Sequence, residues 1–524
     1  MQQRKLTHHY KNYAYILALI IFSFLINFYY SFIGVMPLDN FVLYNGGYRV
    51  LKGYIPFNDY WLVTGPLLDY LNALYFKLFE VNWISYVSHS STFNVLISVS
   101  TYFVFLSIGL RREWSFIYSL LFSVLMYPVV GTPFVDHHSS IFLILGFYLY
   151  IHAIVNKKFL LLIYVPTIMI LSFLSKQTPA SYGIIAIIIL TFSFNFFAKD
   201  DFKVIFKNLT LGSIIGIAFI FLFFFLTKIN LENFVTQYIL FSQSIGKFRI
   251  VQNYSDFNIF NLIEEFKFIF IHIFILFYFL ITFIKKKNLR EIKIIIPIIV
   301  LALIHILHQT ITFNQNYIFF LIPLLAGFTH YYVEKNYDKK KYIIISVLVL
   351  VCFFSVYKYH LRFNEHRKFN ELEKVNLELA LEGGKIHDSL KGIKWITHLF
   401  PDNPELEIKQ LRTSLEILKS NTKKTMIITP YQFIAPALNI YDNSPNQWHH
   451  PSVSFPKKGQ PYFDNYKSFF LESIKKNNIQ GIYVIGKEEE NTPTLIFQEN
   501  CLEKNKLDEI IFYYSIQKNC KDFE

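Results

Sequence analysis

The chain has 524 residues, of which 53% are hydrophobic, 19% aromatic and only 17% charged, with a formal net charge of +13. A soluble globular domain carries about a quarter charged residues, and disordered chains are poor in aromatic residues. The composition therefore excludes a soluble monomer and a disordered chain, and it predicts a polytopic α-helical membrane protein. Three cysteines exclude a disulfide-built scaffold, and no Cys/His spacing is that of a zinc finger.

Apolar segments long enough to cross a bilayer recur along most of the chain. A spanning helix needs about 20 mostly apolar residues. By this criterion we expect about eleven transmembrane helices, with starts near Tyr13, Trp83, Trp114, Ser139, Phe159, Pro179, Leu209, Lys267, Ile292, Tyr317 and Tyr342. The first segment lacks the small-residue cleavage site of a signal peptide, so we expect it to remain as an anchor.

Basic residues concentrate in alternate loops between these segments. They include Arg4 and Lys5, Arg111–Arg112, Lys157–Lys158, Lys285–Lys287 and Lys339–Lys341. Because lysine and arginine favour cytoplasmic loops, this pattern predicts a multi-pass protein of the cytoplasmic (inner) membrane with a cytoplasmic N-terminus. The same pattern accounts for the net charge, so we expect the lipid bilayer as a partner and no nucleic acid.

The composition changes after residue 357. Residues 1–357 are predicted to form the transmembrane catalytic domain, and residues 358–524 a small extracytoplasmic α/β domain. Its expected elements are helices at Pro404–Ser420 and Asp464–Asn477 and strands at Thr425–Thr429, Gly481–Ile485 and Glu509–Ser515. Cys501 and Cys520 lie in this part, where oxidising conditions would permit a disulfide; the sequence leaves their pairing open.

Two predicted outer loops are long, about Met36–Asn82 and Lys228–Phe266, and loops of this length usually carry function. The first contains an amphipathic segment, Leu67–Phe79, whose apolar residues recur every three or four positions. That spacing predicts an interfacial helix.

Three charged residues fall on this same predicted face, directly beside apolar segments. Asp39 opens the first long loop, and Asp136 and Lys176 lie in shorter loops. An ionised group at the edge of the hydrocarbon is costly without a partner or a purpose. Two carboxylates and an ammonium gathered there would activate a hydroxyl and bind a phosphate. The alternative is that each residue ends a span and meets lipid headgroups.

The order of these motifs resembles the GT-C membrane glycosyltransferases, the superfamily of protein O-mannosyltransferases and bacterial aminoarabinose transferases, including bacterial relatives that use polyprenyl-phosphate sugars. The resemblance covers roughly the first 330 residues. It rests on Asp39, on Gly53, Pro56 and Asp59, on Gly65-Pro66-Leu67, on Asp136, on the Leu-Ser-Lys-Gln-Thr-Pro-Ala run around Lys176, and on Tyr317 with Ile322-Pro323. The chain departs from the pattern at Asn40, where some relatives have a second acid, and at Asn316, where many have a basic residue.

The resemblance implies an inverting transfer of a sugar from a polyprenyl-phosphate donor to a hydroxyl of a glycan, lipid or protein acceptor. Asp39 would be the general base, a role typically worth about 10²–10⁴-fold in rate. Asp136 would share in catalysis, and with His137 it would position the acceptor or hold a divalent cation. No cofactor is certain, because some relatives need no metal.

Further residues would bind the substrates. Lys176 would stabilise the charge on the leaving phosphate, and Arg249, with Lys247 beside it, would close over the donor phosphate. Asp59 would help to position the substrate.

Other patterns admit two interpretations. His305 and His308 would form a ligand pair or proton relay, or, as the sequence favours, would hydrogen-bond between helices. Trp448-His449-His450 would line an acceptor groove or form an ordinary surface loop. A transporter or flippase for lipid-linked sugars is the alternative function, but transporters tend to place ionisable residues at the membrane midplane, whereas here the acids lie in outer loops. A membrane scaffold leaves the long first loop unexplained.

Overall fold

The structure is a computed structural model that describes residues 2–195, 199–253, 258–312, 317–337, 340–517 and 520. The chain forms two compact units that interleave along the sequence. A helical unit comprises Met1–Ser31, Ser90–Leu222 and Gln252–Phe369, and a mixed unit comprises Phe32–His89, Phe223–Val251 and Asn370–Glu524. The division into domains at residues 357 and 358 stays a prediction.

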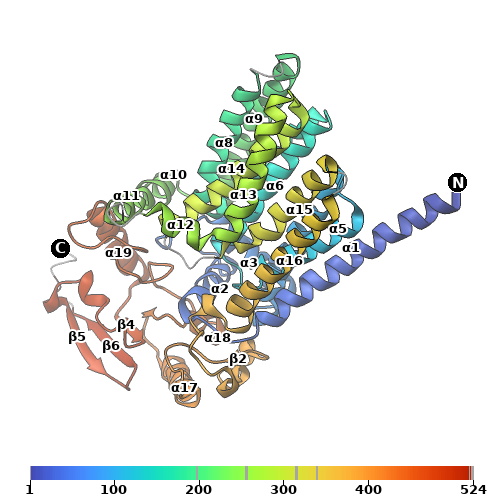
Figure 1. The fold of residues 1–524 in the computed structure, drawn as a ribbon. Coiled ribbons are helices and arrows are strands. Elements are labelled where there is room, and N and C mark those ends of the chain that lie inside the picture. The colour runs from blue at the N-terminus through green and yellow to red at the C-terminus, as the bar shows by residue number, and fades with distance from the viewer. Residues whose placement is uncertain are drawn as a thin grey trace. The chain divides into compact units, whose positions relative to one another are not determined.

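The helical unit consists mainly of apolar helices (Figure 1). They are α1 (Gln2–Tyr30), α4 (Trp83–Ile108), α5 (Arg112–Leu125), α6 (Val135–Val155), η1 (Phe159–Ile163), α7 (Tyr164–Ser175), α8 (Gln177–Asn195), α9 (Lys199–Thr227), α12 (Ile259–Glu265), α13 (Lys267–Lys285), α14 (Leu289–Thr312), η4 (Ile318–Phe320), α15 (Leu321–Asn336), α16 (Lys341–His360) and η5 (Leu361–Glu365). The predicted polytopic α-helical fold is confirmed.

The predicted number of spans needs refinement. Within the described residues, eight helices are long and apolar enough to cross a membrane: α1, α4, α6, α8, α9, α13, α14 and α16. The other three expected spans are shorter helices, namely α5, α7 with η1, and α15 with η4. A 14-residue helix such as α5 reaches only about 21 Å at 1.5 Å per residue, which is less than the roughly 30 Å of the hydrocarbon core.

Helix α6 is central to the helical unit. Its most apolar window is 78% buried, more than that of any other candidate span, and α7, α8 and α14 all pack against it. The core around it is built from aliphatic and aromatic side chains, including Leu143, Phe147 and Ile298. This packing brings the N-terminal end of α6 beside the junction of α7 and α8.

The mixed unit combines short helices with a four-stranded sheet (Figure 1). Its helices are α2 (Pro37–Leu51), α3 (Leu67–Phe79), α10 (Leu231–Phe234), η2 (Val235–Phe241), α11 (Ser242–Asn253), α17 (Pro404–Ser420), α18 (Ile434–Leu438) and α19 (Phe463–Asn477). Its strands are β1 (Leu381–Glu382), β2 (Lys394–Trp395), β3 (Thr425–Ile428), β4 (Gly481–Ile485), β5 (Leu502–Lys506) and β6 (Ile511–Ile516).

The larger sheet has the order β3-β4-β6-β5. Strands β3 and β4 are parallel, with Thr425 opposite Gly481, and the other pairs are antiparallel. Both predicted helices and all three predicted strands of this region are confirmed. Strand β5 was not predicted, because it is an edge strand whose Glu503–Lys506 segment is exposed and polar, so it lacks the apolar alternation of a half-buried strand.

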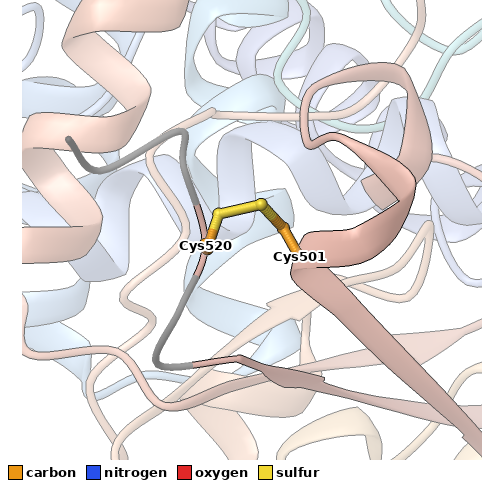
Figure 2. The surroundings of a disulfide bond; sticks show 2 residues. All are labelled: Cys501 and Cys520. Carbon is orange, nitrogen blue, oxygen red and sulfur yellow. A yellow bond between two sulfur atoms is a disulfide. The ribbon is translucent and has the colours of Figure 1, made fainter.

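Cys501 and Cys520 form a disulfide (Figure 2), with Cα atoms 4.6 Å apart. Both cysteines belong to the apolar core that also contains Ile482 and Phe512 of the sheet. The bond therefore ties the segment after β6 to the residue that precedes β5, and it resolves the pairing that the sequence left open.

Helices α2 and α3 pack closely because α2 carries two consecutive glycines. A Cβ atom on Gly47 would lie 2.4 Å from Cβ of Asn72, and one on Gly46 would lie 2.1 Å from Oδ1 of Asp69. Asn72 in turn donates a hydrogen bond to the carbonyl of Leu43. The sequence predicted α3 but not α2, because the Asn-Gly-Gly stretch masks the helical pattern.

We expect Gly47→Ala to lower the melting temperature of the purified protein by a few degrees, since overpacking of this kind costs about 1–3 kcal/mol. Gly246→Ala in α11 is the control, because a Cβ atom there meets nothing within 4 Å and alanine favours a helix over glycine. Equal melting temperatures for the two variants would show that α2 and α3 leave room for a Cβ atom at Gly47.

Candidate active site

Three ionisable side chains meet at the N-terminal end of α6. The Asp136 side chain is 1% exposed, and the ammonium nitrogen of Lys176 donates to both of its carboxylate oxygens at 2.7 Å. His308 of α14 places its Nε2 atom 2.8 Å from Oδ1 of the same carboxylate. An ion pair among apolar helices costs desolvation energy and is usually retained for function.

The local sequence explains where Lys176 sits. Helix α7 ends at Ser175, Lys176 has an extended backbone, and α8 begins at the next residue. Thr178 also leaves the helical conformation, as expected for a residue that precedes a proline. The hydroxyl of Ser139 on α6 donates to the Lys176 carbonyl at 3.3 Å. The junction thus presents the lysine to α6.

Aromatic rings lie beside this cluster. The His137 ring stacks on Tyr317, with centroids 4.6 Å apart, and both residues are buried. The Tyr317 hydroxyl lies 3.4 Å from Nε2 of His308. His138 bonds instead to the hydroxyl of Tyr127. The structure therefore brings together three predicted residues, Asp136, His137 and Lys176. Asn316 lies outside the described residues.

The sequence left a divalent cation open, and this cluster does not suit one. Both oxygens of Asp136 already accept hydrogen bonds from the Lys176 ammonium, and this positive charge repels a metal ion. Among the residues that the structure describes, no group of three or more His, Cys, Asp or Glu side chains is arranged to hold a metal. We therefore assign no step to a metal.

The remaining predicted site residues belong to the mixed unit. Asp39 lies half-buried in the first turn of α2, which starts at Pro37. The neighbouring Asn40 accepts a hydrogen bond from the Met36 amide at 2.8 Å. A carboxylate in the first turn of a helix is stabilised in its ionised form by the helix dipole. Asp39 is thus the charged group at this end of α2, whereas Asn40 accepts the hydrogen bond from the Met36 amide.

Asp59 and Arg249 have different surroundings. Asp59 accepts a hydrogen bond from the Ile55 amide at 2.8 Å and pairs with the exposed Lys476 at 3.1 Å. These contacts close a local turn and connect it to α19. Arg249 lies half-buried on α11, and Lys247 is exposed. Their roles in substrate binding stay predictions.

A second buried polar cluster was missed by the sequence analysis. Arg49 of α2 donates to Asp442 at 2.5 Å and to the Asn446 carbonyl at 2.8 Å, and Asn45 also donates to Asp442. A small recess beside it is lined by residues that include Thr429, Gln432 and His449. The sequence signal was an arginine within the first long loop, and its partner Asp442 lies 393 positions away.

Asp69 on α3 is a buried carboxyl group in the same unit. It accepts hydrogen bonds from Tyr60 at 2.7 Å and from Gln447 at 3.1 Å. Burial raises its pKa from 3.8 to about 7, although these hydrogen bonds and the charge of Arg49 act in the opposite direction. The folded protein therefore binds a proton at Asp69 more tightly than the unfolded chain does.

The stability that Asp69 contributes is complete below pH 4 and is lost as the pH rises from about 4 to 7. Asp69→Asn cannot ionise, so we expect its melting temperature relative to the wild type to rise by a few degrees across this interval. Thermal unfolding monitored by intrinsic fluorescence measures the difference. A constant difference between pH 4 and pH 8 would contradict the raised pKa.

Comparison with known proteins gives structural matches only. No protein-family model matches the chain, and no curated protein matches it. The chain is similar to the oligosaccharyltransferase AglB from Archaeoglobus fulgidus in complex with an inhibitory peptide and a dolichol-phosphate, with 11% identity, a TM-score of 0.47, and coverage of 97% of this chain and 75% of that one.

Two further solved structures are similar. They are the Archaeoglobus fulgidus oligosaccharyltransferase in the apo form (10% identity, TM-score 0.49, covering 92% of this chain and 71% of that one) and ArnT from Cupriavidus metallidurans bound to undecaprenyl phosphate (10% identity, TM-score 0.47, covering 97% and 98%). At such identities these matches assign no substrate or residue role to this chain.

Proposed function

We propose that this protein is an inverting membrane glycosyltransferase that moves a sugar from a polyprenyl-phosphate donor to an acceptor hydroxyl at the outer face of the cytoplasmic membrane. The observation that carries the proposal is the Lys176–Asp136 pair at the end of an apolar helix hairpin. The Lys176 side chain is 18% exposed, and an ammonium has three N–H donors, of which Asp136 takes two. The third N–H of Lys176 is suited to donate a hydrogen bond to a lipid-linked phosphate.

The proposed reaction is a single displacement. The acceptor oxygen attacks the anomeric carbon while the bond from that carbon to the phosphate oxygen breaks. Asp39 takes the proton of the acceptor hydroxyl, and the Lys176 ammonium stabilises the charge that develops on the polyprenyl phosphate. Asp136 supports the reaction by holding Lys176, since a carboxylate bound to an ammonium and an imidazole is a poor proton acceptor.

The experiment that tests this function uses the purified protein in liposomes with a radiolabelled polyprenyl-phosphate sugar. We expect the label to move to an acceptor in a membrane extract and free polyprenyl phosphate to appear. Movement of intact donor between leaflets without cleavage would instead show a flippase, and the proposal would be wrong.

The proposed orientation places the C-terminal residues outside the cytoplasm. It is supported by the basic loops and by the Cys501–Cys520 disulfide, because such bonds persist in oxidising compartments. Lys458 and Lys286 are both exposed. In intact spheroplasts we expect an impermeant thiol reagent to label Lys458→Cys and to label Lys286→Cys only after lysis. The reverse pattern would invert the topology.

A further inference from the structure

The carboxylate of Asp136 on α6 accepts hydrogen bonds from two residues of other parts of the helical unit. Lys176 approaches from the α7–α8 junction and His308 from α14. An ionised carboxylate only accepts hydrogen bonds, so Nε2 of His308 carries the hydrogen and donates it. His308 is fully buried. It therefore restrains the rotation of the carboxylate about its terminal bond, which is otherwise soft.

The restrained carboxylate matters for Lys176, because a lysine side chain has a flexible four-carbon stem and does not fix the position of its own ammonium. The two N–H···O bonds to Asp136 fix the direction of its remaining N–H only while the carboxylate keeps one orientation. Productive geometry in active sites is held to within about 0.5 Å by residues that support the contacting groups. His308 supplies that support here, together with Tyr317 beside it.

We propose that His308 is a positioning residue for donor binding, which acts by orienting Asp136 and through it the Lys176 ammonium toward a lipid-linked phosphate. The proposal rests on the proposed function. It assigns no proton transfer to His308. In the sequence, His308 stood out as a histidine within an apolar span, and the favoured interpretation was a hydrogen bond between helices. Its partner, Asp136, lies 172 positions away.

The test compares His308→Leu with His308→Gln. The leucine removes the donor to Asp136, whereas the glutamine amide supplies an N–H in its place. We expect His308→Leu to lower kcat/KM for a polyprenyl-phosphate sugar about 10–100-fold, the range seen when groups that support ligand residues are removed, mainly through the donor KM. We expect kcat/KM of His308→Gln to lie within a few-fold of the wild-type value, and its pH profile to match that of the wild type.

His305→Leu is the matched control. His305 lies one turn earlier on α14, is equally buried, and its Nδ1 atom bonds to the Leu301 carbonyl of its own helix at 2.9 Å. We expect this variant to keep the wild-type donor KM even if its melting temperature falls. Equal losses in His305→Leu and His308→Leu would show a general packing effect and overturn the proposal. A His308→Gln variant as poor as His308→Leu, with a changed pH profile, would show a proton-transfer role and overturn it as well.

A second measurement does not depend on glycosyl transfer. Competitive acylation followed by mass spectrometry reports how readily Lys176 reacts in the intact protein. We expect the Lys176 peptide to react several-fold faster in His308→Leu than in the wild type, and His308→Gln to react at the wild-type rate. Identical rates in all three proteins would overturn the positioning role. If the wild type transfers no sugar, the proposed function fails, while this labelling still decides the role of His308.

Discussion

Asp39→Asn is expected to leave the fold intact and to reduce the rate of sugar transfer by about 10²-fold or more, the range typical for loss of a general base. Asparagine keeps the size and much of the hydrogen bonding of the aspartate, but it cannot take a proton from the acceptor hydroxyl. Turnover of a labelled polyprenyl-phosphate sugar by the purified variant gives the rate, and thermal unfolding checks the fold.

The neighbouring residue supplies the control. The Asn40 side chain accepts the hydrogen bond from the Met36 amide at the start of α2, so Asn40→Ala removes this hydrogen bond and is expected to cost about 1 kcal/mol of stability with little effect on turnover. A well-folded Asp39→Asn protein with near-normal turnover would remove Asp39 from the chemistry.

Lys176→Ala is expected to abolish donor use and also to destabilise the protein. Removal of the ammonium leaves Asp136, whose side chain is 1% exposed, as a buried charge without its cation, which typically costs about 3–5 kcal/mol. Lys176→Arg retains a positive charge with a different shape, so we expect partial activity. Transfer rates and melting temperatures of the same preparations measure both effects.

The double variant Lys176→Met/Asp136→Asn separates stability from catalysis. It removes both charges, while the asparagine side-chain oxygen still accepts from His308. We expect most of the lost stability to return and transfer to remain absent, because nothing is left to stabilise the leaving phosphate. Recovery of transfer together with stability would show that the ion pair is purely structural.

Much of the fold followed from local patterns in the sequence. Mean hydropathy over about 20 residues identifies helices such as α6 and α14 because burial in a bilayer acts on each residue nearly independently. The same holds for α17, whose start at Pro404 is set by the Asn403 side chain that accepts from the Leu406 amide. Such signals lie within one turn or one strand, so they need no knowledge of the partner.

The candidate site was only partly visible in the sequence. Asp136 and Lys176 stood out as charges beside apolar segments, and this contrast is a local property. Their direct pairing at 2.7 Å across 40 positions, and the bond from His308, depend on how α6, α14 and the α7–α8 junction pack. With these contacts, the role that we propose for Asp136 changes from sharing in catalysis and positioning the acceptor to support of Lys176.

The sequence by itself determined the membrane class, the apolar helices, most of the strands near the C-terminus and the charged residues that merit attention, because each of these depends on neighbours within a few positions. Only the tertiary structure decided that Arg49 pairs with Asp442 and that Lys176 and His308 share one carboxylate. The physical reason is that a buried charge selects its partner by distance and geometry in space, and the sequence carries no record of which distant group packing will bring within about 3 Å.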